Sequence, residues 1–289
     1  MRRPLVALLV VLPSLATVAC HRGGSEDHAF EWSAPLPTGA VLHLRDGTGS
    51  ITVRRVDASN THVVGSRRWV RGRAKDVEFV VTQSGNDYYI CAMWQYSGRC
   101  GASGYHGAGG GGLLEMINLF HHRSDASAGL IAEVPATVVI DARTTLGSVR
   151  VDGVTAGVTA RAVNGIVEAT NVSGPVVLTT TNGSVRLRAD SLAPSDSVRL
   201  TTTNGSVHAD VPAGLEGMFD LSVTNGSVHS DLPVPKLSGA RANRHLQGQL
   251  GSLPRVFRMR SVNGMVSLVT HSAASAATAP AAASVSTPR

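Results

Sequence analysis

A short motif built on an Asn-Gly or Leu-Gly pair recurs through the second half of this 289-residue chain. Its copies are TNGSV at 181–185, 203–207 and 224–228, VNGIV at 163–167, VNGMV at 262–266 and TLGSV at 145–149. Their glycines are separated by intervals of 18, 18, 22, 21 and 38 residues. A period of this length is typical of repeat architectures, in which each repeat contacts only its neighbours. The repeat therefore constrains the fold more than any other feature of the sequence.

Residues on both sides of each glycine alternate between apolar and polar. The positions seven and five before the glycine are apolar in every copy, and the second residue after it is always Val. The positions four before and three after the glycine are polar in every copy. Alternation with period two is typical of a strand with one buried face. Each copy is therefore predicted to be two strands joined by a turn.

The arrangement of these strands follows from the turn and the period. An Asn-Gly pair is favoured where two successive residues need positive φ. A hairpin would make the strands antiparallel, whereas identical residues at one period favour stacking of like on like. We therefore predict an all-β fold, a single-domain parallel β-solenoid of 18–22-residue coils, each stacked on the coil before it. The interval of 38 corresponds to two periods, or to one coil with an insertion at 238–254.

The stacked turns are predicted to form a structural ladder along one edge. Stacked asparagine amides can hydrogen-bond one another, which satisfies groups that are costly to leave unpaired. The residues of this turn ladder are Asn164, Gly165, Asn182, Gly183, Asn204, Gly205, Asn225, Gly226, Asn263 and Gly264.

The N-terminal half repeats the pattern weakly. DGTGSITV at 46–53 has the same order of glycine, small polar and branched apolar residues, and strands are expected at 61–66, 77–82 and 87–93. The pattern is broken at 98–128, where a glycine-rich stretch precedes LLEMINLF at 113–120. We predict an insertion there, a loop followed by a short amphipathic helix or an apolar flap. Its apolar part would either cap one end of the solenoid or dock a partner.

These features together resemble a known family. The DGTGS-type start, the segment GLIAEVPATVVIDART at 129–144 and the stacked NGSV coils resemble the bacterial putative-adhesin domain of unknown function, over residues 40–270. The resemblance implies an exported β-solenoid with an adhesin-like role or another interaction at the cell envelope. It supplies no catalytic residues.

The N-terminus predicts export. Residues 1–19 combine two arginines with an apolar run, as in a signal peptide, and the run is too short and too interrupted by Pro13 for a comfortable membrane-spanning helix. The sequence LATVAC at 15–20 resembles a lipobox, which predicts lipid attachment at Cys20 and a membrane-anchored protein facing the periplasm or the cell surface. Secretion after Ala19 without lipid is the alternative. Residues 20–39 are predicted to be a tether, and the Ala/Ser/Pro-rich residues 271–289 a disordered tail.

Cys91 and Cys100 are the two cysteines that remain after Cys20. In an exported chain they most simply form a disulfide. Two free buried thiols are the alternative. A metal site fits less well because neither cysteine belongs to a CxxC pair.

The charge of the chain is mildly basic. The formal net charge is +6, but the arginines are scattered and there are only two lysines, Lys75 and Lys236. The sequence shows no compact basic patch of the kind that tracks nucleic-acid phosphates, so nucleic acid is not expected as a partner. Attraction to an acidic envelope polymer or a lipid surface remains open.

The polar positions of the repeat hold the candidates for chemistry. Stacking in chain order would put His208 and His229 about 5 Å apart on neighbouring coils. With Asp210 and Asp231 they form an HxD pair on each coil, which could hold Zn²⁺ or Cu²⁺. Surface histidines duplicated with the coils are the simpler explanation. Asp152, Asp210 and Asp231 could also serve a carbohydrate-active β-helix enzyme, but two coils are expected between Asp152 and Asp210, which favours a solvated face.

We therefore predict a non-catalytic protein anchored in the bacterial envelope, without catalytic residues or a cofactor. It would act as an adhesin-like or structural interaction module that binds an envelope polysaccharide or a protein partner. The alternative is a metal-binding or carbohydrate-active β-helix enzyme. Ligand specificity is expected at the position three after each glycine, where the side chain changes from coil to coil. These residues are Arg150, Glu168, Arg186, His208 and His229.

Overall fold

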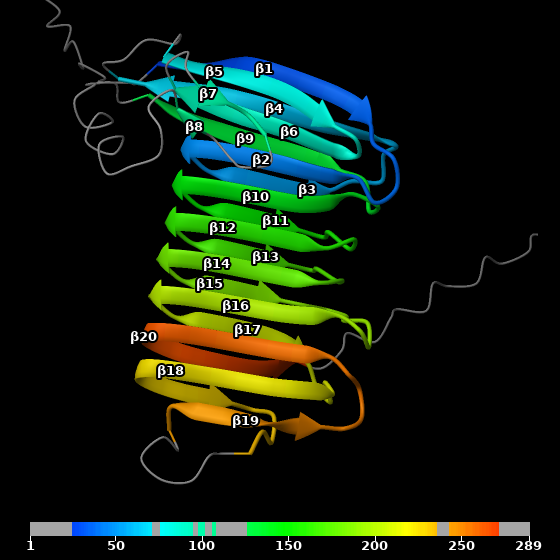
Figure 1. The fold of residues 1–289 in the computed structure, drawn as a ribbon, viewed down its shortest axis with the longest axis vertical. Coiled ribbons are helices and arrows are strands. Elements are labelled where there is room, and N and C mark those ends of the chain that lie inside the picture. Colours follow the sequence, from blue (N-terminus) through cyan, green and yellow to red (C-terminus); the bar gives the residue numbers. More distant parts are fainter. Residues whose placement is uncertain are drawn as a thin grey trace, which may run out of the picture.

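The computed structural model describes residues 25–70, 76–94, 98–101, 106–107, 126–235 and 243–271, and its arrangement is shown in Figure 1. Eighteen strands form one hydrogen-bonded sheet, and two short strands form a second. The described ranges contain no α-helix, and so none that could span a membrane. The predicted signal peptide, Cys20 and the predicted tail beyond His271 lie outside these residues.

The middle of the molecule is a stack of two-stranded coils (Figure 1). Each first strand runs to the turn glycine and each second strand leaves it. The coils are β2 (Val41–Thr48) with β3 (Ile51–Arg55), β10 (Val139–Leu146) with β11 (Val149–Asp152), β12 (Val158–Asn164) with β13 (Val167–Thr170), β14 (Val176–Asn182) with β15 (Val185–Arg188), and β16 (Ser197–Asn204) with β17 (Val207–Pro212). Equivalent strands of neighbouring coils pair in parallel, with Val158 beside Val176 and Val176 beside Val198. The predicted all-β, mainly parallel, solenoid-like fold is therefore confirmed.

The last coils do not stack in chain order. The long strands β18 (Gly217–Ser230) and β20 (Val256–His271) each make a whole coil, and β19 (His245–Leu250) lies between them in sequence. However, β20 pairs in parallel with β16 and β17 on one side and with β18 on the other. Figure 1 shows β20 between β17 and β18. The prediction that each coil rests on the preceding one is therefore wrong for β18.

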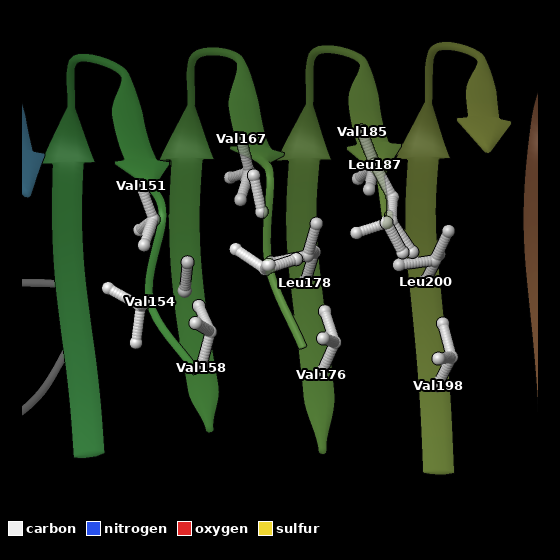
Figure 2. Packing of buried hydrophobic residues seen from close by; sticks show 14 of the residues in the cluster. Val151, Val154, Val158, Val167, Val176, Leu178, Val185, Leu187, Val198 and Leu200 are labelled. Atoms are coloured by element: carbon white, nitrogen blue, oxygen red, sulfur yellow. The ribbon is translucent and has the colours of Figure 1, made fainter. Parts of the chain in front are cut away.

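The core is a double row of stacked apolar side chains inside the coils (Figure 2). Side chains at equivalent positions, such as Val176 and Val198, or Leu178 and Leu200, are at most 1% exposed. Phe219 and Phe257 stack with their ring centroids 5.6 Å apart. Each such side chain contributes about 1.5–3 kcal/mol relative to leaving it in water, so the repeated burial is what stabilises the stack.

The turn glycines are required by two independent features. In the six later turns, from Gly147 to Gly264, the glycine has φ between 144° and 158°. A Cβ on Gly205 would lie 1.9 Å from the carbonyl oxygen of Gly183 in the preceding coil, and the equivalent glycines meet the same obstacle. Successive turns thus approach too closely for any side chain at this position.

The asparagines of the turns form the predicted ladder but do not have the expected backbone conformation. Asn171, which lies in a loop outside the ladder, is the only described residue other than glycine with positive φ, so the expectation of positive φ in the turn asparagines is wrong. As predicted, their side chains form a ladder, a continuous chain of 2.8 Å hydrogen bonds. The donor and acceptor pairs are Asn182 to Asn164, Asn204 to Asn182, Asn263 to Asn204, and Asn225 to Asn263.

The N-terminal end of the stack is closed by antiparallel strands. β6 (Asp87–Trp94) pairs in parallel with β2, and β9 (Ser127–Val134) with β3. Beyond them β5 (Val77–Ser84) is antiparallel to β6, β4 (Asn60–Trp69) to β9, and β1 (Ser25–Pro35) to β4. The three strands expected in this region correspond to β4, β5 and β6. The expected tether is wrong over Ser25–Pro35, because these residues form β1.

Aromatic side chains fill the space between β1, β5 and β6 at this end. The ring of Phe30 stacks on Phe79 with centroids 5.3 Å apart, and Trp32 lies 6.2 Å from Tyr88. The solenoid core is therefore covered at its N-terminal end by strands of the chain itself. The segment 113–120, predicted as a cap or docking patch, lies outside the described residues.

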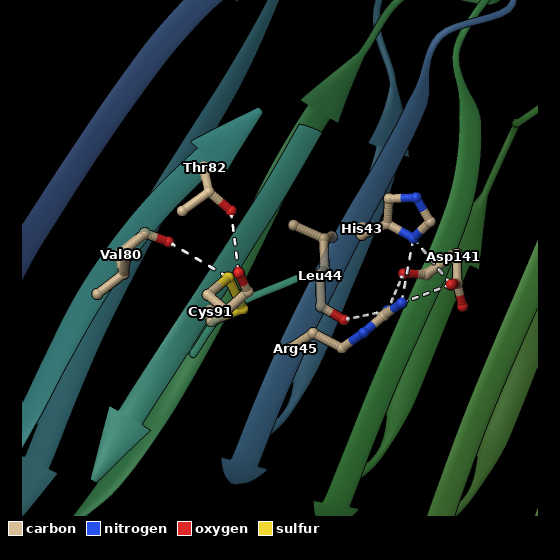
Figure 3. Close-up of a disulfide and its surroundings, with 8 residues drawn as sticks. His43, Leu44, Arg45, Val80, Thr82, Cys91 and Asp141 are labelled. Atoms are coloured by element: carbon tan, nitrogen blue, oxygen red, sulfur yellow. Dashed lines mark hydrogen bonds and ion pairs between the residues drawn. A yellow bond between two sulfur atoms is a disulfide. The ribbon is translucent and has the colours of Figure 1, made fainter. Parts of the chain in front are cut away.

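The predicted disulfide between Cys91 and Cys100 is confirmed (Figure 3). Cys91 is fully buried on β6, and its Cα lies 5.9 Å from that of Cys100. Thr82 on β5 donates a 3.2 Å hydrogen bond to the carbonyl of Cys100. The disulfide thus ties the start of the insertion to the antiparallel cap. Within the insertion β7 (Gly98–Arg99) pairs with β8 (His106–Gly107), and Ser127 and Ala128 already belong to β9.

Candidate functional site

The stack presents two broad faces whose outward side chains form rows along the axis. The first-strand face is formed by β10, β12, β14, β16 and the first halves of β20 and β18, with β2 at its N-terminal end. The second-strand face is formed by β11, β13, β15, β17 and the second halves of β20 and β18, with β3 at its N-terminal end. Because the strands pair in register, side chains of one row are spaced by about 4.8 Å.

The expected ligand residues lie in one row of the second-strand face. Arg150, Glu168, Arg186 and His208 occupy four successive coils in register. Arg150 and Glu168 approach to 3.6 Å between Nε and Oε2. His229 belongs to the same row but is separated from His208 by Ser267 of β20. The row therefore exists, and Ser267, which also follows its turn glycine by three residues, lies between the two histidines.

The alternative of a metal site at the two HxD pairs is wrong because β20 separates its two halves. His208 and His229 both pair with Ser267, so they are two coils apart. The two aspartates of the HxD pairs are also separated, since Asp210 pairs with Val269 of β20. Over the part of the chain that the structure describes, no group of three His, Cys, Asp or Glu side chains is placed to hold a metal ion.

The aspartates of the second-strand face are engaged with neighbouring coils. Asp152 accepts hydrogen bonds from Thr170 and Asn171 at 2.7 and 2.8 Å. Asp210 contacts the His271 ring at 2.6 Å and Arg188 at 3.3 Å. Asp231 accepts from the backbone N–H of Thr270 at 3.2 Å and contacts His229 at 3.0 Å. These contacts tie coils together, which is a structural use of the carboxylates.

A charged cluster that the sequence analysis did not single out lies at the N-terminal end of the first-strand face (Figure 3). The carboxylate of Asp141 on β10 contacts Arg45 and His43 on β2, the latter at 2.9 Å, and accepts two 3.1 Å hydrogen bonds from Arg143. The ring of His43 stacks on Tyr89 of β6 with centroids 4.3 Å apart. The aligned DGTGS turn could have revealed this cluster, because it puts β2 beside β10 in register.

Burial and hydrogen bonding shift the pKa values of Asp141 and Arg45 in this cluster. Burial acts to raise the pKa of Asp141, but hydrogen bonding by His43 and the charge of Arg45 outweigh it and lower that pKa. Burial lowers the pKa of Arg45, and the contact with Asp141 opposes this. The arrangement holds the Asp141 carboxylate between two guanidinium groups, and the Asp87 carboxylate of β6 lies 3.5 Å from Nε2 of His43, so two carboxylates balance the two arginines.

Comparison with known families decides the identity of the fold. Residues 121–268, from the end of the insertion to β20, match the profile of the family described as Toastrack DUF4097. The chain belongs to this family. The match covers the stacked coils from β10 to β18 and β20, whereas the coil of β2 and β3 lies before it.

Solved structures similar to this Toastrack protein are described as adhesion proteins. One is a putative cell adhesion protein from Clostridium sporogenes, 10% identical, with a TM-score of 0.47, covering 86% of this chain and 100% of its own. Another is a putative adhesin from Bacteroides fragilis, 10% identical, with a TM-score of 0.31, covering 83% of this chain and 96% of its own. No curated protein matches the sequence.

One turn of the Toastrack stack differs from the others in its buried polar residue. In four of the six later coils a hydroxyl three residues before the glycine donates to the carbonyl of the glycine one coil away, as Thr144 does to Gly49 and Thr202 to Gly183, both at 2.8 Å, and in the other two the position is apolar. Asp46 takes this position in the coil of β2 and β3. It is 6% exposed, and its Oδ2 has no hydrogen-bond partner within the described ranges. Burial raises its pKa to about 8, against hydrogen bonds from the Thr48 and Gly47 backbone.

The edge opposite the Asn-Gly turns carries a shallow hollow of about 330 Å³ between the loops that connect the coils. Arg255 lines it and is only 4% exposed. Its guanidinium donates to the carbonyl oxygens of Leu192, Ala193 and Glu216. The hollow is thus a place where Arg255 holds three loops together, and its charged group is already used by the protein.

Proposed function

We propose that this Toastrack protein is a non-catalytic, adhesin-like interaction module of the bacterial cell envelope. The observation that supports this best is the row of outward polar side chains in register on successive coils, from Arg150 to His208 and on to His229. Hydrogen-bonded strands fix the spacing of such a row, so its side chains are pre-organised to make many weak contacts with an extended ligand. An envelope polysaccharide or a protein partner would fit this kind of surface.

An envelope location is supported by two features. The disulfide between Cys91 and Cys100 is typical of proteins that mature in an oxidising compartment outside the cytoplasm. The sequence at 15–20 adds the proposal that lipid on Cys20 anchors the protein in a membrane, since two or more acyl chains give stable attachment. The first strand starts at Ser25, so the anchor would hold the solenoid close to the bilayer.

The anchor is tested by replacing Cys20 with Ala in the full chain and fractionating the cells. The variant is expected in the soluble fraction, and labelling with a radioactive fatty acid should mark the wild-type protein but not the variant. Membrane attachment that persists in the variant would refute the lipid anchor.

The interaction role is tested by a pull-down from envelope extracts with immobilised full-length protein. Wild type is expected to retain an envelope component, and the double variant Arg186→Ser, His208→Ser should retain about fivefold less, since each exposed charge or hydrogen-bond contact contributes about 0.2–1 kcal/mol. Arg54→Gln on β3, outside the row, is the matched control and should bind like wild type. Retention of nothing above the blank resin would refute the proposal.

A further inference from the structure

The two faces of the solenoid differ in charge. From β10 to β18, the outward positions of the first-strand face hold five arginines and two aspartates, an excess of three positive charges. These are Arg143, Arg161, Arg199, Arg258 and Arg260, with Asp141 and Asp220. The equivalent positions of the second-strand face hold three arginines, Arg150, Arg186 and Arg188, against four carboxylates, Asp152, Glu168, Asp210 and Asp231. The basic excess of the coils therefore lies on one face only.

Arginines stand next to each other on the first-strand face. Arg143 pairs with Arg161 on the neighbouring coil, and Arg199 pairs with Arg258. Like charges directly opposite each other on paired strands destabilise a sheet. Arg161 and Arg199 are exposed, and neither has an ion-pair partner within the described ranges. The fold thus carries an unfavourable arrangement of charge that a bound anion would offset.

The remaining arginines are held in place by carboxylates. Oδ2 of Asp220 on β18 accepts hydrogen bonds from Arg258 at 3.0 Å and from Arg260 at 2.9 Å, and its Oδ1 contacts His245 at 3.1 Å. Each guanidinium has five N–H donors, and each of these two uses one on Asp220. Asp220 thus orients both guanidinium groups while their other donors stay available. Asp141 orients Arg143 in the same way at the other end of the row.

We propose that Arg143, Arg161, Arg199, Arg258 and Arg260, the arginine stripe, bind a linear acidic polysaccharide that lies along the solenoid axis. This inference rests on the proposed envelope role and adds a second binding face, opposite the row from Arg150 to His229, with a ligand class of its own. Arg143 and Arg258 are four coils apart, so the stripe spans about 19 Å. A guanidinium fork matches the geometry of a carboxylate, so the charged groups of a polyuronate suit the stripe.

The side chains between the arginines favour a polysaccharide over other polyanions. The two coils between Arg161 and Arg260 present the half-buried hydroxyls of Thr179 and Thr201 in the same row. Hydroxyls both donate and accept hydrogen bonds, as the hydroxyls of a sugar require.

The stripe depends on the position of β20. Arg199 lies beside Arg258 only because β20 is inserted next to β16, and Asp220 reaches both Arg258 and Arg260 because β18 follows β20 in the stack. Arg199 and Arg258 are 59 residues apart in the sequence, which is why the sequence showed no compact basic patch.

The test is binding of polygalacturonate to the full-length protein in detergent, measured by calorimetry at low and moderate salt. The variant Arg161→Gln, Arg199→Gln removes the two stripe arginines without an ion-pair partner in the described ranges, and Arg54→Gln, Arg55→Gln removes the same charge from the exposed end of β3, outside the stripe. We expect about fivefold or more weaker binding for the stripe variant and wild-type binding for the control, as two exposed charge contacts predict. Binding should weaken with added salt, and dextran, a neutral polymer, should not bind.

Three outcomes would overturn the inference. They are equal weakening in the stripe variant and the control, equal binding of dextran and polygalacturonate, and polyphosphate or DNA binding more than tenfold tighter than polygalacturonate. Thermal unfolding separates binding from structure. Because removal of a like-charge neighbour is expected to raise the Tm by about 1–2 °C, a clear drop in Tm for the stripe variant would indicate a structural role instead.

The inference and the proposed function can fail separately. If wild type and the stripe variant retain the same envelope component equally and neither binds polygalacturonate, the stripe is refuted and the interaction role stands. If wild type retains no envelope component but binds polygalacturonate through the stripe, the envelope role is refuted and the stripe stands.

Discussion

The side chain of Asn263 donates a 2.8 Å hydrogen bond to Asn204, which lies 59 residues earlier in the chain. Asn225, which lies between them in sequence, instead donates to Asn263. The ladder is therefore continuous through all five coils even though the last two exchange their order. The hydrogen bond from Asn263 to Asn204 thus completes the ladder and forms only because β20 lies next to β16.

Replacing Asn204 with Ala should weaken the middle of this ladder. Asn182 would lose its donor and Asn263 its acceptor. A hydrogen bond contributes about 0.5–1.5 kcal/mol, and these two are exposed, so we expect a loss of about 1 kcal/mol. The Tm should fall by about 2–4 °C in calorimetry. Asn60→Ala, an exposed asparagine at the start of β4, is the control, and an equal effect there would contradict a special role for the ladder.

Replacing Gly205 with Ala should be much more damaging. Its φ is 150°, and the new Cβ would overlap the carbonyl oxygen of Gly183, so the backbone of two coils would have to move. We expect a loss of about 3 kcal/mol or more in urea denaturation, or failure to fold. Gly214 has φ of 79° but open space at its Cβ position, so Gly214→Ala should cost only about 1–2 kcal/mol. Similar losses for both would show that close approach of the turns is unimportant.

The disulfide should stabilise the protein measurably. Closing a loop with a sequence separation of 9 is worth about 2.5 kcal/mol in the chain-entropy treatment. A reductant should therefore lower the Tm of wild type and have no effect on Cys91→Ala, Cys100→Ala. Mass spectrometry before and after reduction checks that the bond was present. An unchanged Tm of wild type after confirmed reduction would contradict the prediction.

Asp46 should make the stability depend on pH. The pKa is 3.8 in the unfolded chain and about 8 in the fold, so between these values the folded state holds the extra proton. The contribution of protonated Asp46 to the free energy of unfolding is fully present below about pH 4. It is lost as the pH rises to about 8, because the buried carboxyl must then ionise. Asp46→Asn keeps a neutral side chain and should remain stable where wild type weakens, in urea titrations from pH 5 to pH 9. Asp57→Asn, at a site where 92% of the side chain is exposed, should follow wild type, and parallel curves for Asp46→Asn and wild type would refute the assignment.

The coils themselves were accessible from sequence because a single rule repeats in each of them. Alternation around the glycine assigns Val176, Leu178 and Val185 to the core without any other information, and all three are buried. The ladder followed from the identity of the stacked residues. Because side chains alternate across a strand, the position of a residue relative to the glycine determines whether it is buried, and the sequence is sufficient to predict that.

The order of the last two coils could not be predicted, because β18 or β20 could follow β17 with the same apolar side chains in the core. Phe219 of β18 and Phe257 of β20 occupy the same position, so both strands offer the same apolar face to β16. The choice depends on β19, which pairs antiparallel with the outer edge of β18 and leaves only its inner edge for β20. The short strand β19, which lacks the repeat pattern, thus determines which outward side chains of the last coils are neighbours. The arginine stripe and the separation of His208 from His229 both follow from it.

The position of β20 also limits how the protein can acquire its structure during synthesis. In an ordinary solenoid each newly made coil can settle on the finished ones, so growth proceeds in step with the ribosome. Here β18 emerges before the strand that must lie beneath it, and until Val256–His271 is made β17 and β18 have open edges that another chain could occupy. The sixteen residues of β20 close both of these edges. A chain truncated before them would therefore be prone to associate with other copies through the open edges, in addition to lacking one coil.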